Sequence, residues 1–176
     1  MRSFLLFIFA ALTQAACAST PVDAVPVSNF DGERYLGKWY EIARLDHGFE
    51  RGLSEVTATY SRRDDGGIKV ENTGCKAEKA EWENATGKAY FTKGATTGQL
   101  KVSFFGPFYG KYIVFDLDQE DYEYAYISGG TTKYLWLLAR KPEISKQRRA
   151  DFISKAKSIG YATDDLIWVE QTGMCG

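Results

Sequence analysis

Short segments in which apolar and polar residues alternate fill most of this chain, and glycine-containing turns separate them. Alternation with a period of two is typical of strands that bury one face. The Asp64–Gly67 turn marks a hairpin of this kind. The expected strands are 36–45, 54–61, 68–72, 87–92, 100–105, 112–117, 122–128 and 134–140. Such a series predicts an all-β, eight-stranded antiparallel up-and-down barrel, because closure leaves no edge strand unpaired.

One helix is predicted after the strands. Ser145 can cap its start and Gly160 can end it. Phe152 and Ala156 fall on one face of this helix. We therefore expect a C-terminal α-helix that packs on the outside of the barrel, followed by a short strand at 166–170.

The N-terminus differs in character from the rest of the chain. Arg2 precedes the apolar run Phe4–Leu12, and small residues follow up to Ala18. This pattern is typical of a secretory signal, and the run is too short to span a bilayer as a permanent helix. The expected organisation is a signal peptide at 1–18, a tether at 19–29 and one barrel domain at 30–176.

Two processing routes remain open at the end of the signal. Cleavage after Ala18 would discard Cys17. Alternatively, the small residues before Cys17 resemble the end of a bacterial lipoprotein signal, in which the cysteine becomes the lipidated first residue. Gln14 stands where that signal prefers leucine. A lipidated Cys17 predicts a membrane partner reached through an N-terminal lipid anchor.

Whichever route applies, Cys75 and Cys175 are the two cysteines left with a free thiol in the mature chain. Exported chains tend to pair their thiols in an oxidising compartment. We therefore expect a Cys75–Cys175 disulfide. Closing a loop of about 100 residues would contribute about 4–5 kcal/mol of stability in the chain-entropy model.

Composition and motifs argue against several functions. The formal net charge is -1 and no basic patch stands out, so nucleic acid is not an expected partner. We find no Ser-His-Asp set, no metal-ligand spacing and no phosphate loop, and the single histidine, His47, is expected on a loop. No histidine or cysteine is expected inside the barrel as a haem ligand. The sequence thus predicts no enzyme, no catalytic residue, no metal and no cofactor.

Specific residues resemble a known family. Gly37-Lys38-Trp39 is similar to the lipocalin G-x-W signature, and Arg140 matches the arginine that lipocalins pack across that tryptophan. Segments 35–60, 87–92, 100–110 and 134–140 resemble the bacterial outer-membrane lipoprotein lipocalins, which are related to apolipoprotein D. The likeness runs from about Asn29 to Gln171. It implies an eight-stranded barrel with an apolar ligand inside.

The resemblance assigns a structural role to Gly37, Trp39 and Arg140. A guanidinium over the indole face would close the barrel floor by a cation–π contact. Glu41 is expected to pair with Arg140, since a buried carboxylate needs a partner. We expect this group to hold the fold rather than to contact ligand.

The register that the resemblance implies places Trp39 inside the barrel at its closed end. Because side chains alternate across a strand, Glu41, Ala43 and Leu45 are then also expected to point inward. The residues expected to bind ligand are Ala43, Val56, Ala58, Tyr60, Val102, Phe104, Ala125, Ile127, Trp136 and Leu138. An eight-stranded barrel is just wide enough for one small ligand. Small and wide apolar side chains together favour an alkyl chain, because each buried methylene contributes roughly 0.8 kcal/mol.

The predicted function is to bind and store or transport a fatty acid or lysophospholipid at the cell envelope. Loop 46–53, with His47 and Arg51, is expected over the mouth as a polar rim for the ligand headgroup. The expected location is the periplasmic side of the outer membrane, held by lipid, with a secreted or soluble periplasmic protein as the alternative. A structural lipoprotein with a filled barrel is the first alternative function and a lipocalin-type isomerase the second. The resemblance also allows a homodimer.

Overall fold

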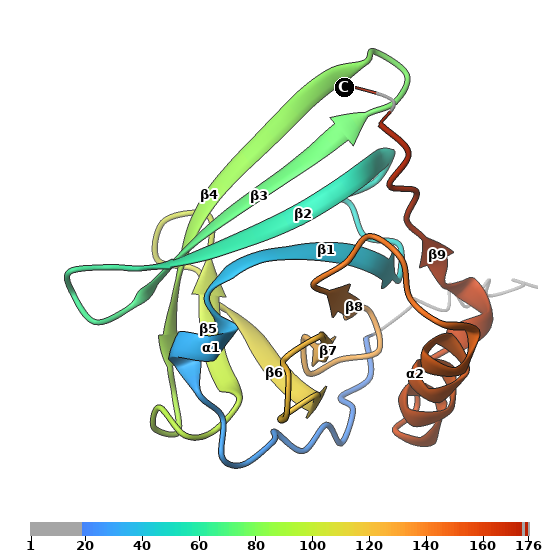
Figure 1. Ribbon diagram of the computed structural model, residues 1–176. Coiled ribbons are helices and arrows are strands. Elements are labelled where there is room, and N and C mark those ends of the chain that lie inside the picture. The colour runs from blue at the N-terminus through green and yellow to red at the C-terminus, as the bar shows by residue number, and fades with distance from the viewer. Residues whose placement is uncertain (1–18, 174, 176) are drawn as a thin grey trace, which may run out of the picture.

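The computed structural model describes residues 19–173 and 175, and Figure 1 shows their arrangement. The predicted signal peptide and Cys17 lie outside the described residues. The strands are β1 (Gly37–Arg44), β2 (Leu53–Arg62), β3 (Ile68–Lys76), β4 (Glu81–Phe91), β5 (Gln99–Ser103), β6 (Gly110–Leu117), β7 (Tyr124–Ser128), β8 (Leu135–Ala139) and β9 (Ile167–Trp168). The helices are α1 (Gly32–Tyr35), α2 (Lys146–Ser158) and the short 3-10 helix η1 (Thr163–Asp165).

Each strand from β1 to β8 pairs antiparallel with the next, and β8 pairs with β1. The predicted up-and-down barrel is therefore confirmed. Its mouth carries the loops 45–52, 77–80, 104–109 and 129–134, and its floor carries the loops at the opposite strand ends. In the part of the chain that the structure describes, no helix is long and apolar enough to cross a membrane.

The hairpin of β3 and β4 is longer than the alternation predicts. Its two strands pair without a break from Ile68–Ala89 to Lys76–Glu81, and in Figure 1 they project beyond the rest of the barrel. β5 pairs only with the second half of β4, beginning at Lys88. Residues 81–86 are exposed on both faces, so they carry no alternation of apolar and polar residues. For this reason the alternation predicts shorter strands than the structure contains.

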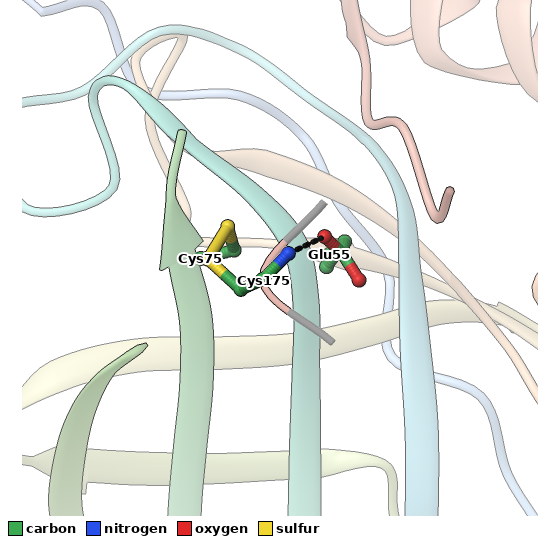
Figure 2. A group of neighbouring side chains, drawn as sticks. All are labelled: Glu55, Cys75 and Cys175. Atoms are coloured by element: carbon green, nitrogen blue, oxygen red, sulfur yellow. Dashed lines mark hydrogen bonds between the residues drawn. A yellow bond between two sulfur atoms is a disulfide. The ribbon is translucent and has the colours of Figure 1, made fainter. Parts of the chain in front are cut away.

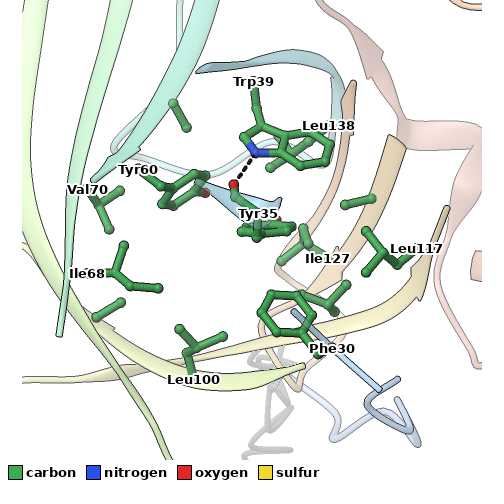
Figure 3. Packing of buried hydrophobic residues seen from close by; sticks show 14 of the residues in the cluster. Phe30, Tyr35, Trp39, Tyr60, Ile68, Val70, Leu100, Leu117, Ile127 and Leu138 are labelled. Atoms are coloured by element: carbon green, nitrogen blue, oxygen red, sulfur yellow. Dashed lines mark hydrogen bonds between the residues drawn. The ribbon is translucent and has the colours of Figure 1, made fainter. Parts of the chain in front are cut away.

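A short helix, α1, forms part of the barrel floor and was not predicted. The Asp31 carboxylate caps it by accepting hydrogen bonds from the backbone N–H of Glu33, at 2.9 Å, and of Arg34, at 3.4 Å. The helix brings the carbonyl oxygen of Tyr35 to 2.8 Å from the indole nitrogen of Trp39, which donates to it. Figure 3 shows this bond within the interior of the barrel.

Arg140 covers the Trp39 ring from below, with its guanidinium carbon 3.8 Å from the ring centroid. It donates hydrogen bonds to the backbone carbonyls of Lys38, Arg34 and Tyr122. The expected pairing of Glu41 with Arg140 is wrong. The Arg140 side chain reaches backbone oxygens instead, and Glu41 pairs with another arginine, described below.

The interior of the barrel is an apolar cluster, part of which Figure 3 shows. We call this set the inner cluster. Its buried members are Phe30, Tyr35, Trp39, Ala58, Tyr60, Ile68, Val70, Ala89, Leu100, Val114, Leu117, Tyr122, Ala125, Ile127 and Leu138. All eight barrel strands contribute to it or pack against it, so closing the barrel buries one shared core.

A second apolar set, the outer cluster, lies between the barrel wall and α2. Ser145 caps α2 by accepting from the backbone N–H of Arg148, and Gly160 follows the helix with a φ of 99°. Phe152 and Ala156 are fully buried in the outer cluster. The predicted helix on the outside of the barrel is confirmed. β9 completes this side by pairing with β1 through Ala43 and Trp168.

A β-bulge in β1 changes which side chains point inward. Opposite β8, Glu41 pairs with Leu138 and Ala43 already pairs with Leu137, so Ile42 is the extra residue. Ala43 and Leu45 consequently lie in the outer cluster. The prediction that they point into the barrel is wrong, because one inserted residue reverses the faces of all later ones.

The segment expected to be a tether, 19–29, lies along the barrel. The backbone N–H of Val22 donates to the carbonyl of Gly130, at 3.3 Å. The backbone N–H of Val27 donates to the carbonyl of Val114 at 2.9 Å, and its carbonyl accepts from Gly98 at 2.9 Å. These backbone bonds fasten the segment at both of its ends.

The predicted Cys75–Cys175 disulfide is present. Figure 2 shows it beside Glu55, whose carboxylate accepts a hydrogen bond from the backbone N–H of Cys175 at 3.1 Å. The bond ties the C-terminal segment to the β3–β4 hairpin, as the path of the chain in Figure 1 shows. Both sulfur atoms are used in this bond, so neither is available as a metal ligand.

Replacing Arg140 by alanine is expected to lower the free energy of unfolding by about 3 kcal/mol. The variant loses one cation–π contact and three charge-assisted hydrogen bonds. Urea unfolding followed by tryptophan fluorescence measures the change. Lys141→Ala, which removes an exposed neighbouring cation, serves as the control and should change little. A structural role for Arg140 is contradicted if the variant keeps full stability and loses only ligand.

Replacing both cysteines by alanine is expected to lower the free energy of unfolding by about 2–5 kcal/mol, because the unfolded chain regains the freedom of a long loop. Thermal or urea unfolding with and without a reducing agent measures this. The reductant should weaken the original chain to the level of the double variant and leave the double variant unchanged. Equal stability of both chains under oxidising conditions would contradict the prediction.

Candidate functional site

The structure brings all but one of the predicted ligand-binding residues to the interior of the barrel. Those buried in the inner cluster are Ala58, Tyr60, Ala125, Ile127 and Leu138, and Val102, Phe104 and Trp136 pack against it. Val56 is buried beside Gly74 on the same face of the sheet. Ala43, as described above, lies outside. We call this apolar interior the chamber, and the ligand-binding role of its residues stays a prediction.

Three tyrosine hydroxyls meet inside this chamber. The Tyr112 hydroxyl lies 2.6 Å from that of Tyr35 and 2.9 Å from that of Tyr60. Burial raises the pKa of all three phenols, so they stay protonated at physiological pH. Among the described residues, three hydroxyl protons thus serve two contacts. One proton remains for a polar group of a ligand.

A buried ionic group lies nearer the mouth. Because of the bulge, Arg44 stands opposite Trp136 and turns into the barrel. Its guanidinium donates to the Glu41 carboxylate at 2.7 Å and to the backbone carbonyls of Glu50 and Leu53 at 2.9 Å. The side chains of Arg44 and Glu41 are only 2% and 3% exposed. The Nε of Arg44 has no hydrogen-bond partner among the described residues.

The environment of Glu41 favours its neutral form. Burial raises the pKa of this carboxyl well above its ordinary value of 4.5, and the nearby charge of Glu50 raises it further. The nearby charge of Arg44 lowers the pKa of Glu41, but by less than burial raises it. A protonated Glu41 leaves Arg44 with a positive charge that is only partly compensated. That charge suits an anionic headgroup.

The loop over the mouth is more closely packed than predicted. The Nε2 of His47 lies 2.9 Å from a Glu50 oxygen, and the Trp136 indole donates to the same oxygen at 3.0 Å. The His47 ring stacks on Phe49 with centroids 4.0 Å apart. His47 is buried, so it belongs to the wall of the mouth rather than to an exposed rim. Arg51 is exposed, as expected for the rim, and pairs with Asp46.

Three small residues lie on the inward face of β4. Ala85, Gly87 and Ala89 share this face with Phe91, and the Phe104 ring lies against Gly87. Ala85 faces inward but is exposed, because it lies on the part of β4 that extends beyond its pairing with β5. Opposite Ala85 stands Asn72, whose buried side-chain oxygen has no hydrogen-bond partner among the described residues. An unpartnered buried acceptor of this kind can bind a ligand hydroxyl.

A separate groove of about 570 Å³ lies under the barrel floor. It runs between α1 and the turns that join β2 to β3 and β4 to β5. Phe30 and Phe91 form part of its wall, together with the ion pair of Arg62 and Glu33. It opens at the end opposite the mouth, so we do not count it as part of the chamber.

Five polar or aromatic residues of the chamber were not predicted from the sequence: Tyr35, Arg44, Glu50, Asn72 and Tyr112. One signal was available for Arg44. Glu41 and Arg44 are three positions apart, with two apolar residues between them. Two charged side chains at an odd spacing share one face of a strand only if a bulge separates them.

The chain is similar in sequence to several known proteins. The chain matches the Lipocalin-like domain family over residues 30–171. It is 54% identical over 171 residues to outer membrane lipoprotein Blc of Vibrio cholerae, which covers 97% of this chain and 99% of that protein. Blc of Escherichia coli (strain K12) is 51% identical, with 93% of each chain covered. Apolipoprotein D of Rattus norvegicus is 32% identical, with 72% of this chain and 67% of that protein covered.

Solved structures support the fold. Lobster apocrustacyanin A1 superimposes with a TM-score of 0.68 at 16% identity, covering 91% of this chain and 94% of its own. Insecticyanin of Manduca sexta gives a TM-score of 0.68 at 21% identity, with 87% of each chain covered. At these identities the likeness concerns the architecture only.

Replacing Glu41 by glutamine is expected to change the pH dependence of stability. Because folding raises the pKa of Glu41, the original chain loses stability as pH rises above about 4.5, until the raised pKa is passed. Glutamine does not titrate, so the stability of Glu41→Gln relative to the original chain should rise over that range, by at most about 1.4 kcal/mol per pH unit. Urea unfolding between pH 4 and pH 9 measures the difference, and a flat or falling difference would contradict a raised pKa.

Proposed function

Because this chain belongs to the lipocalin family, we propose that it binds one fatty acid or lysophospholipid in its barrel and carries or stores it at the bacterial cell envelope. The observation that carries the proposal is the shape of the interior. Wide apolar side chains such as Phe104 and Trp136 pack around the inner cluster, while the inward face of β4 between the mouth and Phe91 bears the small residues Ala85, Gly87 and Ala89. A narrow apolar chamber that opens at one end favours an alkyl chain.

The polar groups of the chamber suit the head of such a ligand. Arg44 presents a buried Nε–H and a positive charge near the mouth, which fit a carboxylate or phosphate. The free oxygen of Asn72 fits a hydroxyl group. A lysophospholipid contains both a phosphate and a glycerol hydroxyl, and a fatty acid contains the acid alone. The pair Arg44 and Asn72 therefore favours a lysophospholipid.

We propose the outer membrane as the location. The bacterial relatives that align with nearly the whole chain are named outer membrane lipoproteins. Cys17, which follows the small residues of a lipoprotein-like signal, would carry the lipid anchor. The proposal is that the protein binds its ligand without chemical conversion. A structural lipoprotein with a filled barrel and a lipocalin-type isomerase are the outcomes against which it is tested.

Native mass spectrometry of the purified mature chain, followed by organic extraction, tests the ligand class. We expect one fatty acid or lysophospholipid per barrel. A chain that purifies empty and shows no thermal stabilisation by either added lipid contradicts the carrier and supports the filled barrel. Conversion of the lipid into a product would instead support the isomerase.

Ala85→Trp is expected to weaken binding of the lipid about tenfold or more. The indole would occupy the inward face of β4 at the open side of the chamber, where the ligand is expected to enter. Ala85 is exposed, so the larger side chain has room and stability should change little. Titration calorimetry with lysophospholipid measures the affinity.

The neighbouring residue supplies a matched control. Thr86 is also exposed on β4, and its side chain points to the outside of the barrel. Thr86→Trp therefore adds the same indole one position along the strand without entering the chamber. We expect it to bind lipid like the original chain. Equal affinities of the two tryptophan variants would contradict a ligand inside the barrel.

A further inference from the structure

A turn at the mouth of the barrel presents two phenylalanine rings to solvent. Phe105 is 80% exposed and Phe108 is 78% exposed. The backbone N–H of Phe108 donates to the carbonyl of Phe105, so Gly106 and Pro107 form the centre of a tight turn with one ring at each end. We call residues 105–108 the aromatic turn. Exposed aromatic side chains held together in this way are typical of an interaction surface.

The surroundings of the aromatic turn are basic. No aspartate or glutamate occurs between Gln99 and Phe115, whereas Lys101 and Lys111 flank the turn on both sides and are exposed. Lys101 lies over the Tyr109 ring, 4.8 Å from its centroid. The loop 129–134 adds the exposed Lys133 and no carboxylate. Apolar rings surrounded by lysines match a surface of anionic phospholipid, whose headgroups attract the lysines and whose acyl region accepts the rings.

The start of the described chain lies at this same end of the barrel. The carbonyl of Thr20 accepts from the backbone N–H of Thr132 at 2.8 Å, and Pro21 forms a β-bridge with Thr131. These contacts place the N-terminal segment on the loop 129–134, which is a mouth loop. Cys17 is two residues before Ser19, and two residues span at most about 7 Å. A lipid on Cys17 would therefore leave the molecule near the mouth.

The aromatic turn and the N-terminal segment belong to neighbouring parts of the mouth. β6, which follows the aromatic turn, pairs with β7, which precedes the loop 129–134. The side chain of Lys111 packs directly on Gly130, where a Cβ atom would lie 2.8 Å from the lysine Cδ. The rings, the lysines and the exit of the chain thus form one face.

We propose that this face docks on an anionic phospholipid surface, so that the mouth of the barrel opens toward the membrane that holds the protein. The orientation rests on the proposed lipid attachment at Cys17, whereas docking by the aromatic turn does not. In this orientation an acyl chain passes between bilayer and barrel without crossing water. A second copy of this chain fits the face less well, because a symmetric partner would bring its own lysines against these.

Sedimentation with large unilamellar vesicles of phosphatidylethanolamine and phosphatidylglycerol tests the docking. The chain from Ser19 onward is used, since it lacks the anchor and contains every strand, helix and disulfide described above. The double variant Phe105→Ser/Phe108→Ser is expected to lower the vesicle partition coefficient about tenfold or more. Val25→Ser removes an apolar side chain that is 70% exposed on the segment 19–29 and is the matched control, with no change expected.

The charge of the face is tested with the same vesicles. The variant Lys111→Gln/Lys133→Gln should bind more weakly than the original chain, and Lys141→Gln, an exposed lysine at the floor end of β8, should not. Quenching of an added tryptophan by brominated lipids reports the insertion directly. Phe108→Trp is expected to be quenched and Val25→Trp is not.

The outcomes separate this proposal from the proposed function. The double serine variant is expected to keep its affinity for lysophospholipid in solution, because its changes lie outside the chamber. Loss of vesicle binding with retained lipid affinity supports docking by the face, and loss of lipid affinity in Ala85→Trp leaves this result unaffected. Docking is overturned if the double variant binds vesicles like the original chain. It is also overturned if the original chain ignores vesicles and instead self-associates through the aromatic turn in analytical ultracentrifugation.

Discussion

The contact of Arg140 with Trp39 is the interaction on which the rest of the barrel depends. The guanidinium covers the indole face. It also donates to the backbone carbonyls of Arg34 at the end of α1, Lys38 in β1 and Tyr122 just before β7. One side chain at the end of the last barrel strand thus joins segments from the beginning and the end of the chain. By donating to these carbonyls, the guanidinium provides partners for backbone acceptors at the closed end and covers the floor.

Because the floor is closed, the two ends of the barrel differ. This difference determines where polar groups can lie inside it. Aromatic rings and apolar side chains fill the lower interior. The hydroxyls of Tyr35, Tyr60 and Tyr112 are polar groups in this interior, and they contact one another. Near the mouth the barrel wall is incomplete, because β5 pairs only with the second half of β4.

The bulge in β1 connects the outer face of the barrel to the chamber. By inserting Ile42, it lets two consecutive apolar residues pack against α2 while Glu41 and Arg44 both turn inward. A regular strand would have to place Arg44 under the helix, where a charged side chain without a partner is costly. The same irregularity therefore completes the apolar contact with α2 and provides the buried charge of the candidate site.

The mouth combines this buried charge with a surface of a different kind. The exposed rings of the aromatic turn and the lysines beside it lie next to the start of the described chain. A protein held by a lipid at that point needs no long tether to bring its mouth to a bilayer. The docking of segment 19–29 along the barrel agrees with this arrangement, since it fixes the direction in which the chain leaves the fold.

Much of the architecture could be predicted from the sequence, because alternation, turn residues and helix caps are local signals. This group includes the eight barrel strands, the helix α2 with its end residues Ser145 and Gly160, and the Cys75–Cys175 disulfide. The Arg140–Trp39 contact followed from the family resemblance. The tertiary structure decided the facing of Ala43, the pairing of Glu41 with Arg44, and the meeting of the N-terminus with loop 129–134. A bulge shifts every later side chain by one face, and contacts across a barrel join residues far apart in the chain, so neither depends on local sequence alone.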